Sequence, residues 1–69
     1  MICINRERFY TLQGELTDTA FAKRLGVSRS QLWRIKNGHC AVGSDFMEKF
    51  MIAYPDRLLN EYFFVKFVP

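Results

Sequence analysis

The chain has 69 residues and a net charge of +3, with 49% hydrophobic and 25% charged residues. This length predicts one domain over residues 1–69, and the composition is that of a packed globular protein, which excludes a disordered chain. No run approaches the roughly 20 apolar residues of a membrane span, and the order of apolar and basic residues at the start is the reverse of that in a signal peptide. Cys3 and Cys40 are the only cysteines, which is fewer than small secreted domains carry and predicts a reduced, intracellular compartment.

Three helix starts with one shared pattern occur in the first half of the chain. Asn5, Thr17 and Ser28 each suit an N-cap, with an apolar residue before the cap and another at the fourth helical position. These apolar pairs are Ile4 with Phe9, Leu16 with Phe21, and Val27 with Leu32. Ser28 and Gln31 also match a capping box. Glycines at positions 14, 26 and 38 suit left-handed helix ends, so the pattern predicts helices over residues 5–13, 17–25 and 28–37.

The second half of the chain predicts a fourth helix and then a strand. The helix starts at Gly43 or Ser44 and ends before Pro55, and its apolar residues at helical spacing, Phe46, Met47, Phe50, Met51 and Tyr54, are expected in the core. A short helical turn is expected within residues 56–61. Residues 62–68 are aromatic and β-branched, and residues 1–4 are similar, so the two segments are predicted to pair as a ribbon, with Phe63, Val65 and Phe67 facing the helices. The expected fold is therefore mainly all-α, with four to five short helices and a small terminal two-stranded β ribbon.

The tight connection between the second and third helices, residues 25–28 with one glycine, is typical of a helix-turn-helix over about residues 17–37. Inward-facing apolar residues are expected on both helices: Phe21, Ala22, Leu25, Leu32 and Ile35. On the opposite side of the third helix, Ser30, Trp33, Arg34 and Asn37 form a stripe that cannot reach the core.

The charge pattern indicates a surface that binds nucleic acid. Between Thr19 and Ser44 there is no acidic residue, while five of the chain's ten Lys and Arg residues fall there. The major groove admits one helix, and Arg to guanine is the commonest specific contact, so Arg29 and Arg34 are predicted to read bases beside Ser30 and Gln31. Phosphate contacts are expected from Thr17, Lys23, Asn37 and His39. The start of the second helix, at Thr17 and Asp18, is an anion site, although the charge of Asp18 opposes a phosphate there.

Residues 17–38, above all the Ala-Lys-Arg-Leu-Gly-Val-Ser-Arg core and the Asn-Gly end, resemble the helix-turn-helix of the lambda-repressor-like (Cro/cI, or xenobiotic-response-element) family. The rest of the chain looks like short phage and prophage-type regulators of Gram-positive bacteria. The resemblance implies a transcriptional regulator of repressor or Cro-like type, with base-reading residues at Arg29, Ser30 and Arg34 and phosphate contacts at Thr17, Asp18 and Asn37. The chain departs from the family at Asp18, where Gln is frequent, and at Trp33, which is unusually large for its place.

Other functions find less support in the sequence. Trp33 could contact DNA, but we expect it to pack against the loop at residues 40–43. Cys3, His39 and Cys40 are too few and too poorly spaced for a structural zinc site. The lone His has no nucleophile or carboxylate at a motif spacing, so we expect no enzyme and no cofactor. No small-molecule ligand is evident.

The competing class is a protein-interaction module, such as an antirepressor, that uses the same fold without reading bases. Such a protein should have lost Arg29, Arg34 and Lys36 or gained acidic residues beside them, and all three are present. We expect a cytoplasmic bacterial protein, nucleoid-associated when bound, that forms a homodimer through residues 62–68. In the alternative, residues 1–4 cover this edge, and the free protein is a monomer that dimerises only on DNA.

Overall fold

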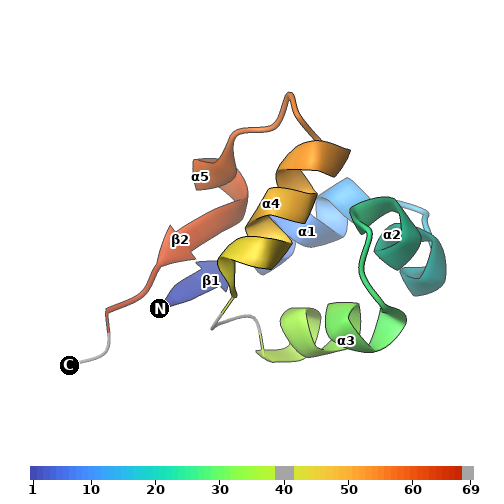
Figure 1. Cartoon of the computed structure of the whole chain (residues 1–69), viewed down its shortest axis with the longest axis horizontal. Helices are drawn as coiled ribbons and strands as arrows, with labels where there is room; N and C mark the ends of the chain where they lie inside the picture. The colour runs from blue at the N-terminus through green and yellow to red at the C-terminus, as the bar shows by residue number, and fades with distance from the viewer. Residues whose placement is uncertain (39–41, 68–69) are drawn as a thin grey trace.

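The computed structural model describes residues 1–38 and 42–67, which form a helical body with a short ribbon at one end (Figure 1). Its elements are, in chain order, β1 (Ile2–Ile4), α1 (Arg6–Gln13), α2 (Asp18–Leu25), α3 (Arg29–Gly38), α4 (Ser44–Ala53), α5 (Leu59–Tyr62) and β2 (Phe63–Val65). The predicted class, mainly helical with a terminal two-stranded ribbon, is confirmed.

Each of the first three helices begins at the predicted N-cap. The side chain of Asn5 accepts a hydrogen bond from the Arg8 amide at 3.4 Å, and Thr17 Oγ1 accepts one from the Ala20 amide at 3.1 Å. Ser28 Oγ accepts one from the Gln31 amide at 3.0 Å, which is the expected half of the capping box. These bonds satisfy amides that the helices themselves leave without partners, so the helix starts follow from local sequence.

The helix ends follow the glycine pattern at two of three positions. Gly14 and Gly26 have positive φ angles, 57° and 75°. The prediction of a left-handed Gly38 is wrong, because α3 includes Gly38 as its last residue with a negative φ. A helix that continues through its glycine needs no left-handed cap at that position.

Aromatic rings fill the centre of the molecule. The Phe9 ring of α1 lies 5.6 Å from each of the Phe50 and Phe63 rings, and the Phe50 and Tyr62 centroids are 5.2 Å apart. The predicted inner residues of the helix-turn-helix, Phe21, Ala22, Leu25 and Leu32, are buried, and Ile35 packs against this core partly buried. The core therefore joins α1, α4, α5 and β2 to the inner sides of α2 and α3.

One residue of α4 that was predicted in the core lies outside it. On α4, Phe46, Phe50 and Tyr54 are buried and Met47 packs partly buried against them, but Met51 is 50% exposed. The three aromatic residues are spaced four apart and fill the inner face of the helix. Each methionine follows one of them by one position; Met47 lines a hollow with Leu59 and Phe63, and Met51 does not.

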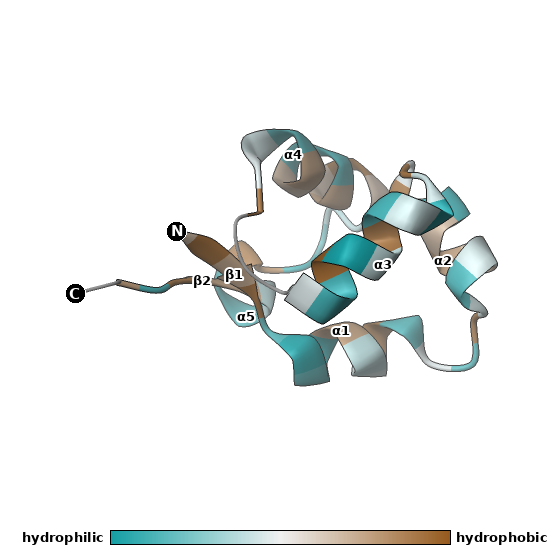
Figure 2. Cartoon of the chain, turned by 90° about the horizontal axis from the view of Figure 1, so that it is seen from below, coloured by the Kyte–Doolittle hydropathy of each residue, from teal (hydrophilic) through white to brown (hydrophobic). Residues whose placement is uncertain are grey.

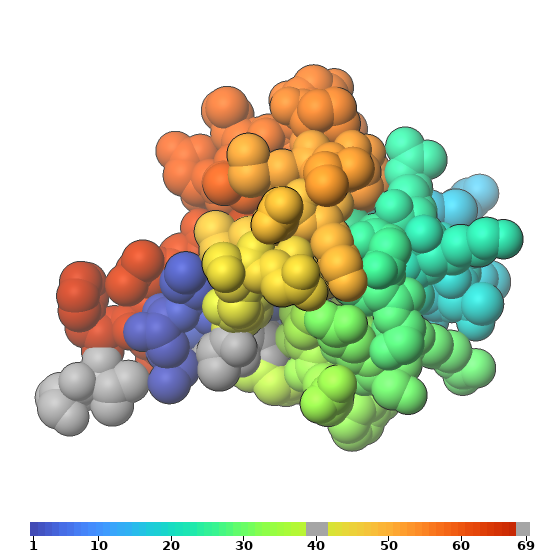
Figure 3. Space-filling model, in the orientation of Figure 1, coloured from blue at the N-terminus to red at the C-terminus, as the bar shows by residue number. Residues whose placement is uncertain are grey.

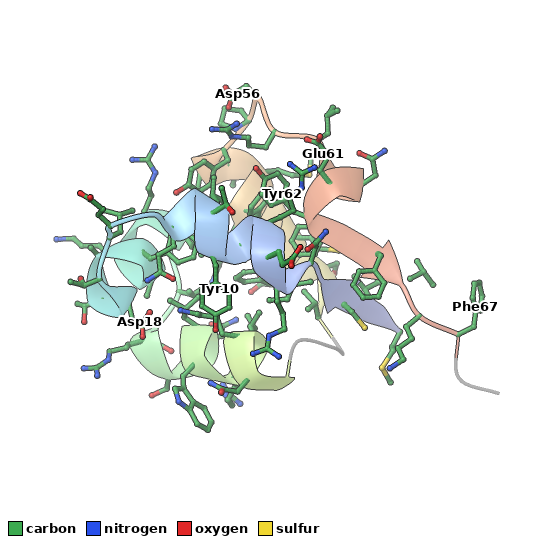
Figure 4. The ribbon with its side chains drawn as sticks, turned by 180° about the vertical axis from the view of Figure 1, so that it is seen from behind. Tyr10, Asp18, Asp56, Glu61, Tyr62 and Phe67 are labelled. Atoms are coloured by element: carbon green, nitrogen blue, oxygen red, sulfur yellow. The ribbon has the colours of Figure 1, made fainter. Side chains whose placement is uncertain are left out.

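The terminal segments pair antiparallel, with Ile2 opposite Val65 and Ile4 opposite Phe63. Ile4 and Phe63 are buried, but Val65 is 59% and Phe67 88% exposed, so the prediction that these two face the helices is wrong. The strand ends at Val65, shorter than the predicted 62–68. Val65 and Phe67 are exposed because β2 runs away from the helices, as Figure 1 shows. Figure 4 shows Phe67 beyond the ribbon, away from the helical body.

Two expectations about compartment can be compared with the structure. Among the described residues no helix combines the length and apolar character needed to cross a membrane. Cys3 is fully buried and disulfide-bonded, in contrast to the reduced state that the cysteine count predicts. Cys40, the other cysteine of the sequence, lies outside the described residues.

Candidate nucleic-acid interface

The turn between α2 and α3 is closed by backbone hydrogen bonds. Gly26 is left-handed, its amide donates to the Lys23 carbonyl at 3.2 Å, and the Val27 amide donates to the Ala22 carbonyl at 3.0 Å. This is the Schellman pattern, in which only a residue with positive φ fits comfortably. Because Ser28 caps α3 two residues later, the relative direction of the two helices is set within a few residues.

The inner side of α3 is held by one buried leucine and its neighbours. Leu32 is 1% exposed, and Ile35 and the preceding Val27 pack partly buried against the core. These contacts leave the opposite side of the helix outside the body. Figure 1 shows α3 along the lower edge of the molecule, and Figure 2, seen from below, shows no element in front of it.

That outer side carries the residues that the spacing predicts. Ser30, Trp33, Arg34 and Asn37 are all exposed, and Arg29, Ser30, Trp33 and Arg34 line one shallow hollow. Trp33 was predicted to pack against the loop at residues 40–43, of which 40 and 41 lie outside the described residues, and at 63% exposed it is not covered as that prediction requires. The ring was expected to be covered by the loop after α3, and on α3 the directions of the side chains place it on the outer stripe instead.

Gln31 lies apart from this stripe. It is half-buried and lines a second hollow between α3 and the start of α4, together with Arg34, Val42 and Asp45. Its place on the flank of α3 removes it from the centre of the outer face. Arg34 borders both hollows, so it is the cation that extends from the outer stripe towards α4.

A polar cluster of Gln13, Asp18 and Lys36 connects α1, α2 and α3. Lys36 Nζ donates to Asp18 Oδ1 at 2.9 Å and to Gln13 Oε1 at 2.8 Å, and Gln13 Nε2 donates to the same Asp18 oxygen at 2.9 Å. Gln13 Nε2 also donates to the Leu16 carbonyl. The Lys36 ammonium lies 4.8 Å from the centre of the Tyr10 ring, which Figure 4 shows between α1 and α3. The Lys36 side chain is 13% exposed and that of Asp18 53%.

The cluster changes the electrostatics at the start of α2. The hydrogen bonds from Lys36 and Gln13, together with the charges of Lys36 and Arg29, hold the pKa of the Asp18 carboxyl below its usual value. Asp18 therefore stays ionised with Lys36 as its partner, and this pair cancels much of the repulsion that an acid would exert on a nearby phosphate.

The predicted phosphate-binding residues differ in exposure and in the hydrogen bonds that they form. Lys23 is exposed on α2, and Thr17 Oγ1 is occupied by the cap bond to Ala20. Asn37 Nδ2 donates to the Trp33 carbonyl at 2.8 Å, so its amide is folded back on α3. His39 lies outside the described residues. Cys40 also lies outside the described residues. Within the described part, no group of three His, Cys, Asp or Glu residues could hold a metal ion.

The five cations of the acid-free stretch divide into two groups. Lys36 is paired with Asp18, and the Arg24 guanidinium lies 4.9 Å from the centre of the Tyr54 ring on α4. Lys23, Arg29 and Arg34 are exposed, and within residues 1–38 and 42–67 none of them forms an ion pair. Within this acid-free stretch, the cations without an ion pair therefore lie on α2 and on the outer face of α3.

Sequence reasoning missed the roles of Gln13 and Lys36. From the sequence, Lys36 was treated as a surface cation. Lys36 follows Leu32 by four positions, however, and so lies on the inward flank of α3. That spacing could have indicated a partner inside the molecule. Nothing in the spacing of Gln13 and Asp18, which belong to different helices, could have identified the partner.

Comparison with known proteins finds no family model, no curated protein and no solved structure that matches the chain. The likeness to the lambda-repressor-like family remains a resemblance of motif.

Proposed function

We propose that the protein binds double-stranded DNA sequence-specifically and acts as a transcriptional regulator of repressor or Cro-like type. The observation that carries the proposal is the outer face of α3, where Arg29, Ser30, Trp33 and Arg34 are exposed side by side with no acidic residue on the helix. A helix at the edge of a small domain fits a major groove about 12 Å wide, and its side chains can then reach base edges.

In this proposal the two arginines have the main base-reading role. Arg34 is central on the exposed stripe, and Arg29 is at the first turn of α3, where recognition helices contact bases. Ser30 lies beside them, whereas Gln31 reads only a base pair at the rim facing α4. Thr17, Lys23, Asn37 and His39 contact phosphates, and Asp18 contributes by positioning Lys36 and α3.

The experiment is a selection from random duplex DNA, followed by binding of the selected duplex at increasing salt. We expect the logarithm of affinity to fall linearly with the logarithm of salt concentration, and Lys23→Ala to reduce that slope by about 0.9. Arg34→Ala should weaken the selected duplex by about 1–3 kcal/mol and random duplex much less. Failure to enrich any sequence, together with affinity that is independent of salt, would contradict the proposal.

A second candidate function is a protein-interaction module, for example an antirepressor, that uses α3 without reading bases. The exposed indole of Trp33 favours it, because Trp is enriched at the centres of protein interfaces. This candidate predicts no enrichment of a sequence in the duplex selection. It gains further support if Arg29→Ala and Arg34→Ala fold normally and leave duplex affinity unchanged.

A homodimer completes the proposal. Among residues 1–38 and 42–67, β2 pairs only with β1, along one edge, and the apolar residues Phe64, Val65 and Phe67 are 47%, 59% and 88% exposed. An unpaired apolar strand edge favours pairing with a second copy. Two copies would present two α3 helices to half-sites about 34–36 Å apart. We place the protein in the bacterial cytoplasm, where that DNA is, and expect no catalytic activity and no cofactor.

Sedimentation of the protein with and without a palindromic selected duplex tests the dimer. We expect two copies per duplex, and Val65→Lys to abolish this assembly with the fold retained, because Val65 is already exposed. Ile52→Lys, at an exposed position on α4, is the matched control. A wild type that stays at one copy per palindrome at saturating concentration would rule out the dimer.

A further inference from the structure

The indole of Trp33 is placed where a nucleic acid would meet it. Trp33 is the only tryptophan of the chain and is 63% exposed on the outer face of α3. It lines a hollow with Arg29, Ser30 and Arg34. The Asn37 side chain next to it donates to the Trp33 carbonyl and is folded against the helix, so it does not cover the ring.

Isolated exposed apolar side chains are common and need no function. Ile52 and Leu58 are such cases, 75% and 62% exposed, and neither lies among free cations on α3. Trp33 differs because it stands among arginines that form no ion pair within the described part of the chain, on the helix that runs along the lower edge of the molecule (Figure 3). A ligand attracted by those charges buries the indole as it binds.

The chemical groups exposed in the major groove limit what the indole can contact. Base edges there present polar donors and acceptors, and the one apolar group among them is the 5-methyl of thymine. Burying an aromatic face against that methyl removes apolar surface of both partners from water. The indole Nε1–H needs an acceptor when it is buried, and thymine O4 and purine N7 both lie in the same groove.

We infer that Trp33 determines specificity by packing its indole against a thymine 5-methyl group beside the base pair that Arg34 reads. The inference depends on the proposed DNA-binding function and deepens it. It assigns to Trp33 a contact of a different kind from those of the two arginines, because a guanidinium recognises guanine through hydrogen bonds and a methyl group accepts none.

The first measurement is the accessibility of the single tryptophan. Fluorescence quenching by acrylamide reports the exposure of Trp33 alone, and binding is followed independently by the anisotropy of a labelled selected duplex. We expect quenching to fall sharply when the duplex is added. If the duplex binds and Trp33 remains as accessible as before, the inference is overturned and DNA binding stands. If no duplex binds, the proposed function fails, and the inference with it.

The second measurement identifies the methyl group. Each thymine of the selected duplex is replaced in turn by deoxyuridine, which removes the methyl and changes no hydrogen-bonding group. We expect one replacement to weaken wild-type binding by about fourfold, the effect of one buried methyl-sized group. The same replacement should leave the affinity of Trp33→Ala unchanged.

Three variants complete the design. Trp33→Ala should lower affinity for the selected duplex by roughly tenfold, and Trp33→Phe, which keeps an aromatic face, should retain part of the methyl effect. Ile52→Ala removes an apolar side chain that is 75% exposed on α4 and should change neither affinity nor the methyl effect. Thermal melting confirms that all three fold. A wild type that is insensitive to every deoxyuridine replacement, or a Trp33→Ala variant with the same sensitivity as wild type, would overturn the inference.

Discussion

The aromatic core and the Gln13–Asp18–Lys36 cluster hold helices together by different means. In the core, the rings of Phe9, Phe50 and Phe63 contact one another at centroid distances of 5.2 to 5.6 Å, and all three are buried. In the cluster, three polar side chains meet through hydrogen bonds of 2.8 to 2.9 Å near the surface.

The core and the cluster contribute differently to stability and to the orientation of the helices. Burial of aromatic surface is strongly stabilising and tolerates several ring orientations, as the mixture of stacked, tilted and edge-on pairs here illustrates. A partly exposed ion pair adds little to stability, but its hydrogen bonds have strict geometry. We therefore expect the core to set the stability of the fold and the cluster to set the orientation of α3 relative to α1 and α2.

The largest effect is expected from Phe50→Ala. Phe50 is 0% exposed and its ring contacts four other rings, so the variant should lose about 3–5 kcal/mol of unfolding free energy. In a domain this small that loss can exceed the whole stability. Denaturant unfolding measures it. Phe67→Ala, at an 88% exposed position, is the control and should unfold at the wild-type midpoint. Equal midpoints for the two variants would mean that the ring cluster is not the centre of stability.

A smaller effect, on binding and not on folding, is expected from the cluster. Lys36→Met removes a cation and Asp18→Asn removes an anion, so a purely electrostatic role predicts opposite changes in duplex affinity. If the cluster orients α3, both variants lose affinity, by roughly two- to thirtyfold, while their melting temperatures stay close to that of wild type.

Lys49→Met is the matched control for the cluster variants, because Lys49 forms an exposed pair with Asp45 on α4 at 3.5 Å. It should weaken binding less than Lys36→Met does. An increase in affinity for Asp18→Asn would show that charge alone matters at this position.

The smallest effect is on the pH dependence of stability. The pKa of Asp18 is lowered in the folded protein, chiefly by the hydrogen bond from Lys36. Its ionised carboxyl therefore stabilises the fold above the unfolded value of about 4, and this contribution is lost as pH falls below that value. Melting temperatures measured from pH 7 to pH 2 should show wild type falling more steeply than Asp18→Asn below about pH 4. Parallel curves would contradict a lowered pKa.

Local sequence was sufficient to determine where the first three helices begin and where two of them end. The caps at Asn5, Thr17 and Ser28 and the positive φ of Gly14 and Gly26 involve residues within a few positions of one another. Such interactions are encoded wherever the chain carries the right residue at the right spacing. The inward stripe of Phe21, Ala22, Leu25 and Leu32 was predictable for the same reason, because helical periodicity fixes which residues share a face.

Only the tertiary structure decided which surfaces are covered. Trp33, Met51, Val65 and Phe67 were expected to pack, and all four are at least half exposed. Lys36 was expected at the surface and instead bonds to Gln13 and Asp18, which lie 23 and 18 positions away in the chain. Periodicity states the direction in which a side chain points from its own helix. Whether another element lies in that direction depends on how all the helices pack, and that is settled by burial summed over the whole core.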